Sequence, residues 1–129
     1  MNKTIVVRGS FTKDVVMWQM VGEFRITRTL AIITALRMEL RQTDFRLNIA
    51  MHEKQLHSAS GEINRLLGTC KTFGLERLYH SSKEVAAERG GNTDDFFKAL
   101  PVLSGLISIT VEHINETIQI LQQNLRQNR

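Results

Sequence analysis

The sequence predicts an all-α fold, an antiparallel four-helix bundle with a short extra helix at its N-terminal end. Three observations lead to this prediction. Apolar residues recur every three or four positions along most of the chain, which is the period of an amphipathic helix. No Asn-Gly or Asp-Gly hairpin turn is present. One proline and eight glycines in 129 residues are too few for a loop-rich β-sandwich.

Four long helical patterns and one short pattern follow one another along the chain. They are expected at residues 23–42, 45–71, 75–88 and 92–121, with the short one at 15–21. Residues 1–22 are therefore predicted to form an N-terminal arm and a short capping helix. Residues 23–129 are predicted to form the helical bundle, so that the chain is a single domain overall.

Short segments between the patterns are predicted to begin and end the helices. Thr43 and Asp44 are expected to cap the N-terminus of the second long helix. The segment 89–91, Arg-Gly-Gly, is typical of a helix end, and the acidic segment 92–95 is typical of a helix start. The helical spacing then predicts core residues, which include Phe45, Ile49, Cys70, Phe97, Leu106 and Ile109.

The composition excludes several classes of protein. A single cysteine, Cys70, rules out a disulfide scaffold and a cysteine-based zinc site, and its place on the apolar stripe predicts an inert buried thiol. His52 and His57 are five residues apart, which is the wrong spacing for a helical zinc pair. We find no run of about 18 apolar residues and no secretory signal, so we expect a cytoplasmic protein that does not span a membrane.

The charge is mildly basic, at +4, and favours an acidic partner. The basic residues are spread along the chain without interleaved aromatic residues, so dedicated nucleic-acid binding is not expected. No Gly-rich phosphate loop, G-x-S-x-G elbow or H-E-x-x-H motif is present, so an independent enzyme is not expected either. His80 and His113 are interpreted as surface residues. Four apolar residues of the arm are interpreted as a cap docked on the bundle, or as a patch for a partner or second copy: Phe11, Met17, Trp18 and Met20.

The segment around His57 is the most informative part of the chain. Gly61 and Gly68 lie inside a helical pattern, where each costs roughly 1 kcal/mol relative to alanine. With His57, Ser60 and Asn64 they form a face of small and polar residues beside the core stripe. A histidine with a glycine four residues later suits exposed phosphoryl transfer, since the imidazole projects into solvent and the glycine leaves room for the aspartyl pocket of a partner.

This segment resembles the histidine-containing phosphotransfer (HPt) domain family, whose members are four-helix bundles with a short N-terminal helix. The family motif is H-x-x-K-G, with a second glycine ten residues after the histidine and a leucine four residues further on. Counting back from Gly74 and Leu78 places Asn64 at the phosphoacceptor position and Leu67 at the lysine position. The proline of A-L-P-V-L near the start of the last helix is also found in many members of the family.

A second register begins from the histidine itself. His57-Ser58-Ala59-Ser60-Gly61 is similar to the motif with Ser60 in place of the lysine, but it needs seven extra residues before the second glycine. Seven residues are close to two helical turns, so both registers present the same face. Lys54, one turn before His57, could replace the missing lysine as the charge partner of a phosphoryl group.

The resemblance implies a signalling module that binds a response-regulator receiver domain or a histidine-kinase domain. His57 is the candidate phosphoacceptor if the protein relays phosphate; if Asn64 holds that position, the protein acts by binding alone. The partner-binding residues are expected to be Lys54, Ser60, Gly61, Asn64, Arg65 and Gly68, with no metal or cofactor held by the chain itself and with a homodimer possible. Two alternatives remain: a helical regulator that sequesters a partner without phosphotransfer, and a small basic helical DNA-binding protein.

Overall fold

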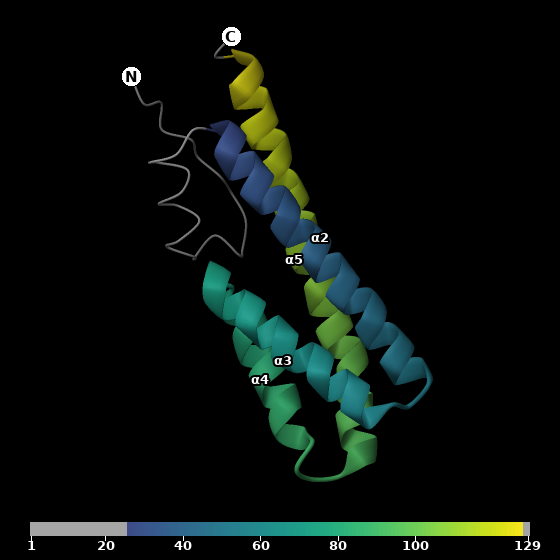
Figure 1. The fold of residues 1–129 in the computed structure, drawn as a ribbon. Helices are drawn as coiled ribbons and strands as arrows, with labels where there is room; N and C mark the ends of the chain where they lie inside the picture. The colour runs from purple at the N-terminus through teal and green to yellow at the C-terminus, as the bar shows by residue number, and fades with distance from the viewer. Residues whose placement is uncertain (1–25, 128–129) are drawn as a thin grey trace.

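A computed structural model describes residues 26–127 of the chain, and these residues fold into four helices (Figure 1). The helices are α2 (Ile26–His52), α3 (Leu56–Phe73), α4 (Glu76–Glu88) and α5 (Thr93–Gln127). The predicted arm and capping helix at residues 1–22, with Trp18 and its apolar neighbours, lie outside the described residues.

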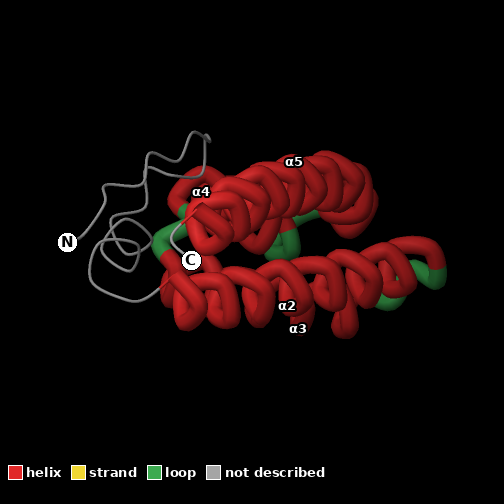
Figure 2. Tube along the Cα trace, turned by 90° about the horizontal axis from the view of Figure 1, so that it is seen from above, coloured by secondary structure: helices red, strands yellow, loops and turns green. Residues whose placement is uncertain are grey.

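The four helices form a bundle in which consecutive helices run in opposite directions (Figure 1). Each helix packs against two neighbours, because α2 contacts α3 and α5, and α4 contacts α3 and α5. Figure 2 shows α3 alongside α2 and α4 alongside α5. Helices α2 and α5 are the long pair, and they continue together past the point where α3 ends and α4 begins. The predicted all-α bundle is therefore confirmed for the described residues.

The boundary between the first two described helices differs from the prediction. Thr43 and Asp44 lie inside α2, and the chain turns instead after His52. Thr43 is buried, and one Asp44 carboxylate oxygen accepts a hydrogen bond from the Ser104 hydroxyl of α5 at 2.6 Å. The Asp44 side chain therefore joins two helices rather than capping one.

The turn that actually ends α2 has a helix-terminating geometry without a glycine. Lys54 adopts a left-handed backbone with φ 53°, the Gln55 N–H donates to the Ala50 carbonyl at 2.8 Å, and the Lys54 N–H donates to the Met51 carbonyl at 3.2 Å. These two bonds form the Schellman arrangement, in which glycine usually takes the left-handed position. Because lysine occupies this position in place of glycine, the sequence contains no residue that indicates the end of the helix.

The end of α4 and the start of α5 agree with the sequence. Helix α4 ends at Glu88, directly before the Arg-Gly-Gly segment, and α5 begins at Thr93 with the Asn92 side-chain oxygen accepting a hydrogen bond from the Asp94 N–H at 2.8 Å. This bond satisfies one of the unpaired N–H groups of the first turn. Helix α5 is longer than expected, since it continues to Gln127.

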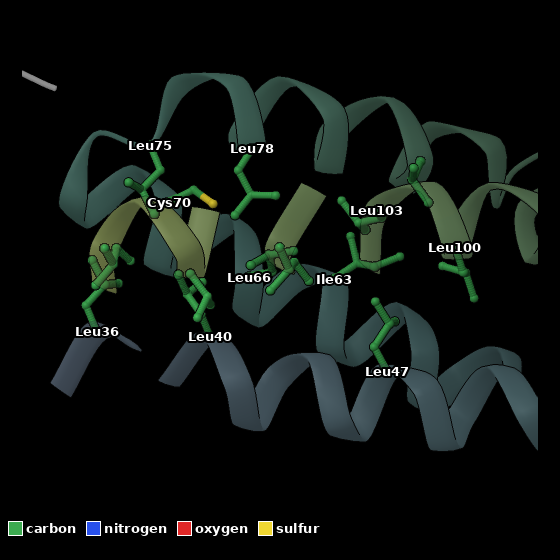
Figure 3. Close-up of a cluster of buried hydrophobic side chains, with 14 of the residues drawn as sticks. Leu36, Leu40, Leu47, Ile63, Leu66, Cys70, Leu75, Leu78, Leu100 and Leu103 are labelled. Atoms are coloured by element: carbon green, nitrogen blue, oxygen red, sulfur yellow. The ribbon is translucent and has the colours of Figure 1, made fainter. Parts of the chain in front are cut away.

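The core fills the space enclosed by the four helices, where apolar side chains from each helix converge (Figure 3). Cys70 is 1% exposed, which agrees with the predicted buried thiol. Three other predicted core residues were wrong: Phe45 and Ile49 are exposed at 67% and 41%, and Ile109 is also exposed. Phe97 and Leu106 are half-buried and pack against the edge of the core. On α5 the fully buried positions are those of Phe96 and Ile107, each next in sequence to one of these half-buried residues. A one-residue shift turns a helical side chain by about 100°, and α5 is apolar at so many positions that either register fits its sequence.

Helix α5 is long and apolar enough to cross a membrane, judged by length and composition alone. The core helix of a bundle passes the same test, and α5 buries side chains from Phe96 to Leu121 along one side. The expected absence of a membrane span and the expected cytoplasmic location therefore stay predictions.

Candidate functional site

Helix α3 carries the residues singled out in the sequence, and its two sides have opposite characters. One side packs into the core through Ala59, Ile63, Leu66 and Cys70. The helix ends at Gly74, whose left-handed backbone (φ 69°) lets the next N–H, that of Leu75, donate to the Cys70 carbonyl at 2.9 Å. Leu75 is itself buried, so this turn fixes both the end of α3 and the start of α4.

The opposite side of α3 presents His57, Gly61, Asn64 and Gly68, which are all exposed. Their spacing of four, three and four residues places them in one row, called here the α3 face. A Cβ atom built at Gly61 or Gly68 would meet no heavy atom of the described residues within 4 Å. Neither glycine is needed for packing in the described part of the fold, and both leave Asn64 without neighbouring side chains along its row.

An open groove lies beside the α3 face, between α3 and α2. It has a volume of about 490 Å³, and its walls include three of the predicted partner-binding residues, Asn64, Arg65 and Gly68. The other lining residues are Ala35, Leu36, Glu39, Thr69, Thr72 and Phe73. No local pattern in the sequence indicates this second set. Glu39 is some 25 residues from Asn64 in the chain, and only the packing of α2 against α3 brings the two together.

The structure separates the other predicted site residues from this groove. His57 is the second residue of α3, and it lies about 10 Å from Asn64 along the helix axis at 1.5 Å per residue. Lys54 is exposed in the turn before α3. Ser60 is only 6% exposed, so its expected place on the docking surface was wrong: it follows Ala59 on the core side of the helix.

An ion pair fixes α3 against α2 next to the groove. The Arg46 Nε donates to one Glu62 carboxylate oxygen at 2.8 Å, with the two side chains 36% and 14% exposed. The carboxylate of Glu62 is therefore engaged within the bundle. The exposed cations of α3 and its preceding turn, Lys54, Arg65 and Lys71, outnumber the one exposed anion of these segments, Glu53, and give this side of the molecule a net positive charge.

The remaining histidines do not assemble a second site. His80 is exposed, as expected, and its ring makes an edge contact with Tyr79 at a centroid distance of 5.8 Å. His113 is half-buried, so it is not the fully solvated residue that was expected. Among residues 26–127, no group of three or more histidine, cysteine, aspartate or glutamate side chains is placed to hold a metal ion.

Comparison of the chain with protein-family models, with curated proteins and with solved structures gives no match. The resemblance to HPt domains therefore rests on the residues of α3 and α4 and on Pro101 of α5.

The glycines of the α3 face give a direct test of the claim that the described fold does not need them. Gly61→Ala and Gly68→Ala are each expected to raise the free energy of unfolding by roughly 0.5–1 kcal/mol, because alanine favours the helix and the space at Cβ is open. Urea unfolding followed by circular dichroism measures the change.

Gly74→Ala is the matched control for this prediction. Gly74 has a φ of 69°, so alanine there is expected to lower stability by about 1–2 kcal/mol. If Gly61→Ala and Gly68→Ala destabilise the protein as Gly74→Ala does, the two glycines serve the fold and not an exposed docking surface.

Proposed function

We propose that this protein is an HPt-like interaction module that binds a receiver domain or a histidine-kinase domain through the α3 face and the adjoining groove. The observation that carries the proposal is the position of Asn64. It is exposed in the middle of α3, with Gly61 three residues before it and Gly68 four residues after it on the same side. A row of this kind lets the surface of a partner approach the helix backbone closely on both sides of one polar side chain.

The turn after α3 supports the register in which Asn64 occupies the phosphoacceptor position. That register counts back from Gly74, and Gly74 is the left-handed residue that ends α3. The left-handed backbone at this position favours glycine. Gly74 is therefore a better reference for aligning the motif than a glycine on an exposed helix face. An asparagine amide lacks the nucleophilic ring nitrogen of histidine, so in this register the module works by binding alone.

Isothermal titration calorimetry with purified receiver domains and histidine-kinase domains tests the proposal. We expect at least one of these domains to bind, and we expect His57→Gln to keep the affinity within a few-fold, because His57 lies at the end of the row. Absence of binding to every domain of both classes would overturn the proposal.

A second candidate function is phosphotransfer through His57, which its exposure and the open space at Gly61 favour. In this reaction an imidazole nitrogen attacks the phosphorus of a receiver's aspartyl phosphate. The P–N bond forms, the bond from phosphorus to the aspartate oxygen breaks, and the carboxylate leaves. The residue at the lysine position of this register, Ser60, is buried, so Lys54 is the cation nearest in sequence that could balance the phosphoryl charge.

Intact mass spectrometry distinguishes these two candidates. After incubation with a small phosphoryl donor and Mg²⁺, the binding-only module is expected to carry no phosphoryl group. A single acid-labile phosphoryl group that is absent from His57→Gln would instead establish the relay.

Binding experiments also distinguish this proposal from the two other classes of function, a sequestering regulator and a DNA-binding protein. A sequestering regulator unrelated to phosphotransfer would use the same face but would bind neither receiver nor kinase domains. A DNA-binding protein would bind duplex DNA with an affinity that falls steeply as salt rises, because each phosphate contact releases counterions. A flat salt response would exclude the DNA reading.

A further inference from the structure

Helix α2 presents an apolar stripe on its outward side, away from the core. Met38, Phe45 and Ile49 are 60%, 67% and 41% exposed, and they account for three of the five large hydrophobic side chains that are exposed in the described part of the chain. They follow one another at seven and four residues, so they lie on one side of the helix. Neither the core nor the groove beside α3 uses these three side chains.

The stripe belongs to a longer heptad pattern. Exposed residues follow one another at spacings of four, three, four, three and four, and they are Ala31, Ala35, Met38, Gln42, Phe45 and Ile49. Alternating three- and four-residue steps are the seam of a two-stranded coiled coil, in which these side chains occupy the a and d positions. A single polar residue at such a seam, here Gln42, commonly fixes the register and the number of strands.

We propose that the protein forms a homodimer in which α2 of one copy packs antiparallel against α2 of a second copy along this seam. In the register with the two-fold axis between Thr43 and Asp44, Met38 faces Ile49 of the partner subunit. Gln42 then faces Phe45 of the partner subunit. Every large apolar residue of the seam is covered by a residue of the other copy.

The charges beside the seam select the antiparallel arrangement. Glu39 and Arg46 flank the seam on one side, and in the antiparallel register each lies next to the opposite charge on the other copy. Arg46 keeps its bond to Glu62 through Nε, and its side chain is still 36% exposed. A parallel pairing would instead bring Arg41 against Arg46 of the partner subunit on both sides of the seam. Like charges in that position disfavour the parallel dimer.

This dimer does not depend on the proposed function, because its apolar contacts lie on α2 and the docking row lies on α3. The seam and the charges that flank it meet the groove only at Ala35, which is in the seam, and at Glu39, which flanks it. Loss of the dimer and loss of partner binding are therefore measured by different variants.

Light scattering coupled to size-exclusion chromatography, with the full chain at about 100 μM, tests the dimer. The wild-type protein is expected to have twice the chain mass of 14.8 kDa, and Phe45→Glu is expected to be a monomer with unchanged helix content. Val102→Glu is the matched control, because Val102 on α5 is also 67% exposed and lies outside the seam, so this variant is expected to stay dimeric. A wild-type monomer, or a Phe45→Glu dimer, would overturn the proposal.

Disulfide crosslinking tests the direction of the helices. Met38→Cys and Ile49→Cys are made separately in a Cys70→Ser background, and each is oxidised alone and after mixing. The antiparallel register predicts a covalent dimer only in the mixture, because residue 38 faces residue 49. Covalent dimers in each single variant but no added product in the mixture would show a parallel pairing and contradict the proposal.

Discussion

Phe96→Ala is expected to lower the free energy of unfolding by about 3–5 kcal/mol, the largest stability change predicted for this protein. Phe96 is completely buried in the first turn of α5, where it packs edge-on against the Phe97 ring at a centroid distance of 5.6 Å. Alanine removes the ring, so the free energy gained by burying it away from water is lost. It also leaves a cavity that the surrounding helices fill only in part. Such a loss is a large share of the 5–15 kcal/mol that stabilises an ordinary domain.

Urea unfolding of Phe96→Ala beside Phe45→Ala measures this effect against a matched control. Phe45 is 67% exposed, so its replacement is expected to change stability by less than about 0.5 kcal/mol unless it breaks the dimer. Measuring both variants in an Ile49→Glu background, in which a charge in the seam is expected to prevent dimerisation, removes that contribution. Equal losses in the two variants would mean that α5 does not present Phe96 to the core.

Gly68→Arg is expected to weaken binding of a receiver or kinase domain at least about 30-fold, the cost of disrupting a central interface position. The backbone at Gly68 is helical and a Cβ atom there meets no neighbour within 4 Å, so a flexible arginine side chain is expected to be tolerated by the described fold. Its side chain would stand in the groove beside Asn64 and Arg65 and would hold a partner away from the helix. Because arginine favours the helix over glycine, fold stability should rise by roughly 0.5–1 kcal/mol while binding falls.

Gly105→Arg is the matched control for this variant. Gly105 is also an exposed helical glycine with open space at its Cβ, but it lies on α5. It is expected to bind the same partner as tightly as the wild-type protein, as judged by calorimetry. Equal losses for the two arginine variants would point to a general charge effect and not to docking at the groove.

The bundle and the α3 face could be predicted from the sequence because both depend on local helical periodicity. The end of α2 could not, for two physical reasons. Asp44 has the chemistry of a helix cap, but its carboxylate is taken by Ser104, which is 60 residues away in the chain. The true turn contains Lys54 in a left-handed conformation, and no glycine or proline marks it.

The buried side of α5 and the groove between α2 and α3 could not be predicted from the sequence, because both depend on how the helices pack. Phe96 and Phe97 are adjacent aromatic residues, so sequence alone does not say which one enters the core, and only the packing of α5 against the other helices decides it. The groove needs Glu39 from α2 and Phe73 from the end of α3 in one place, which requires the relative placement of two helices. The exposed seam of α2 was missed because Phe45 and Ile49 were assigned to the core.

Chemical-shift mapping on the ¹⁵N-labelled protein tests the central claim, that the α3 face is the docking surface, most directly. A chain of 14.8 kDa is small enough for this, and Gly61, Gly68 and Gly105 report on the docking row and on a reference helix. On titration with a receiver or kinase domain that binds, we expect the largest shift changes at Gly61, Asn64 and Gly68, and little change at Gly105. Changes concentrated on α5, with the amides of α3 unmoved, would contradict the account.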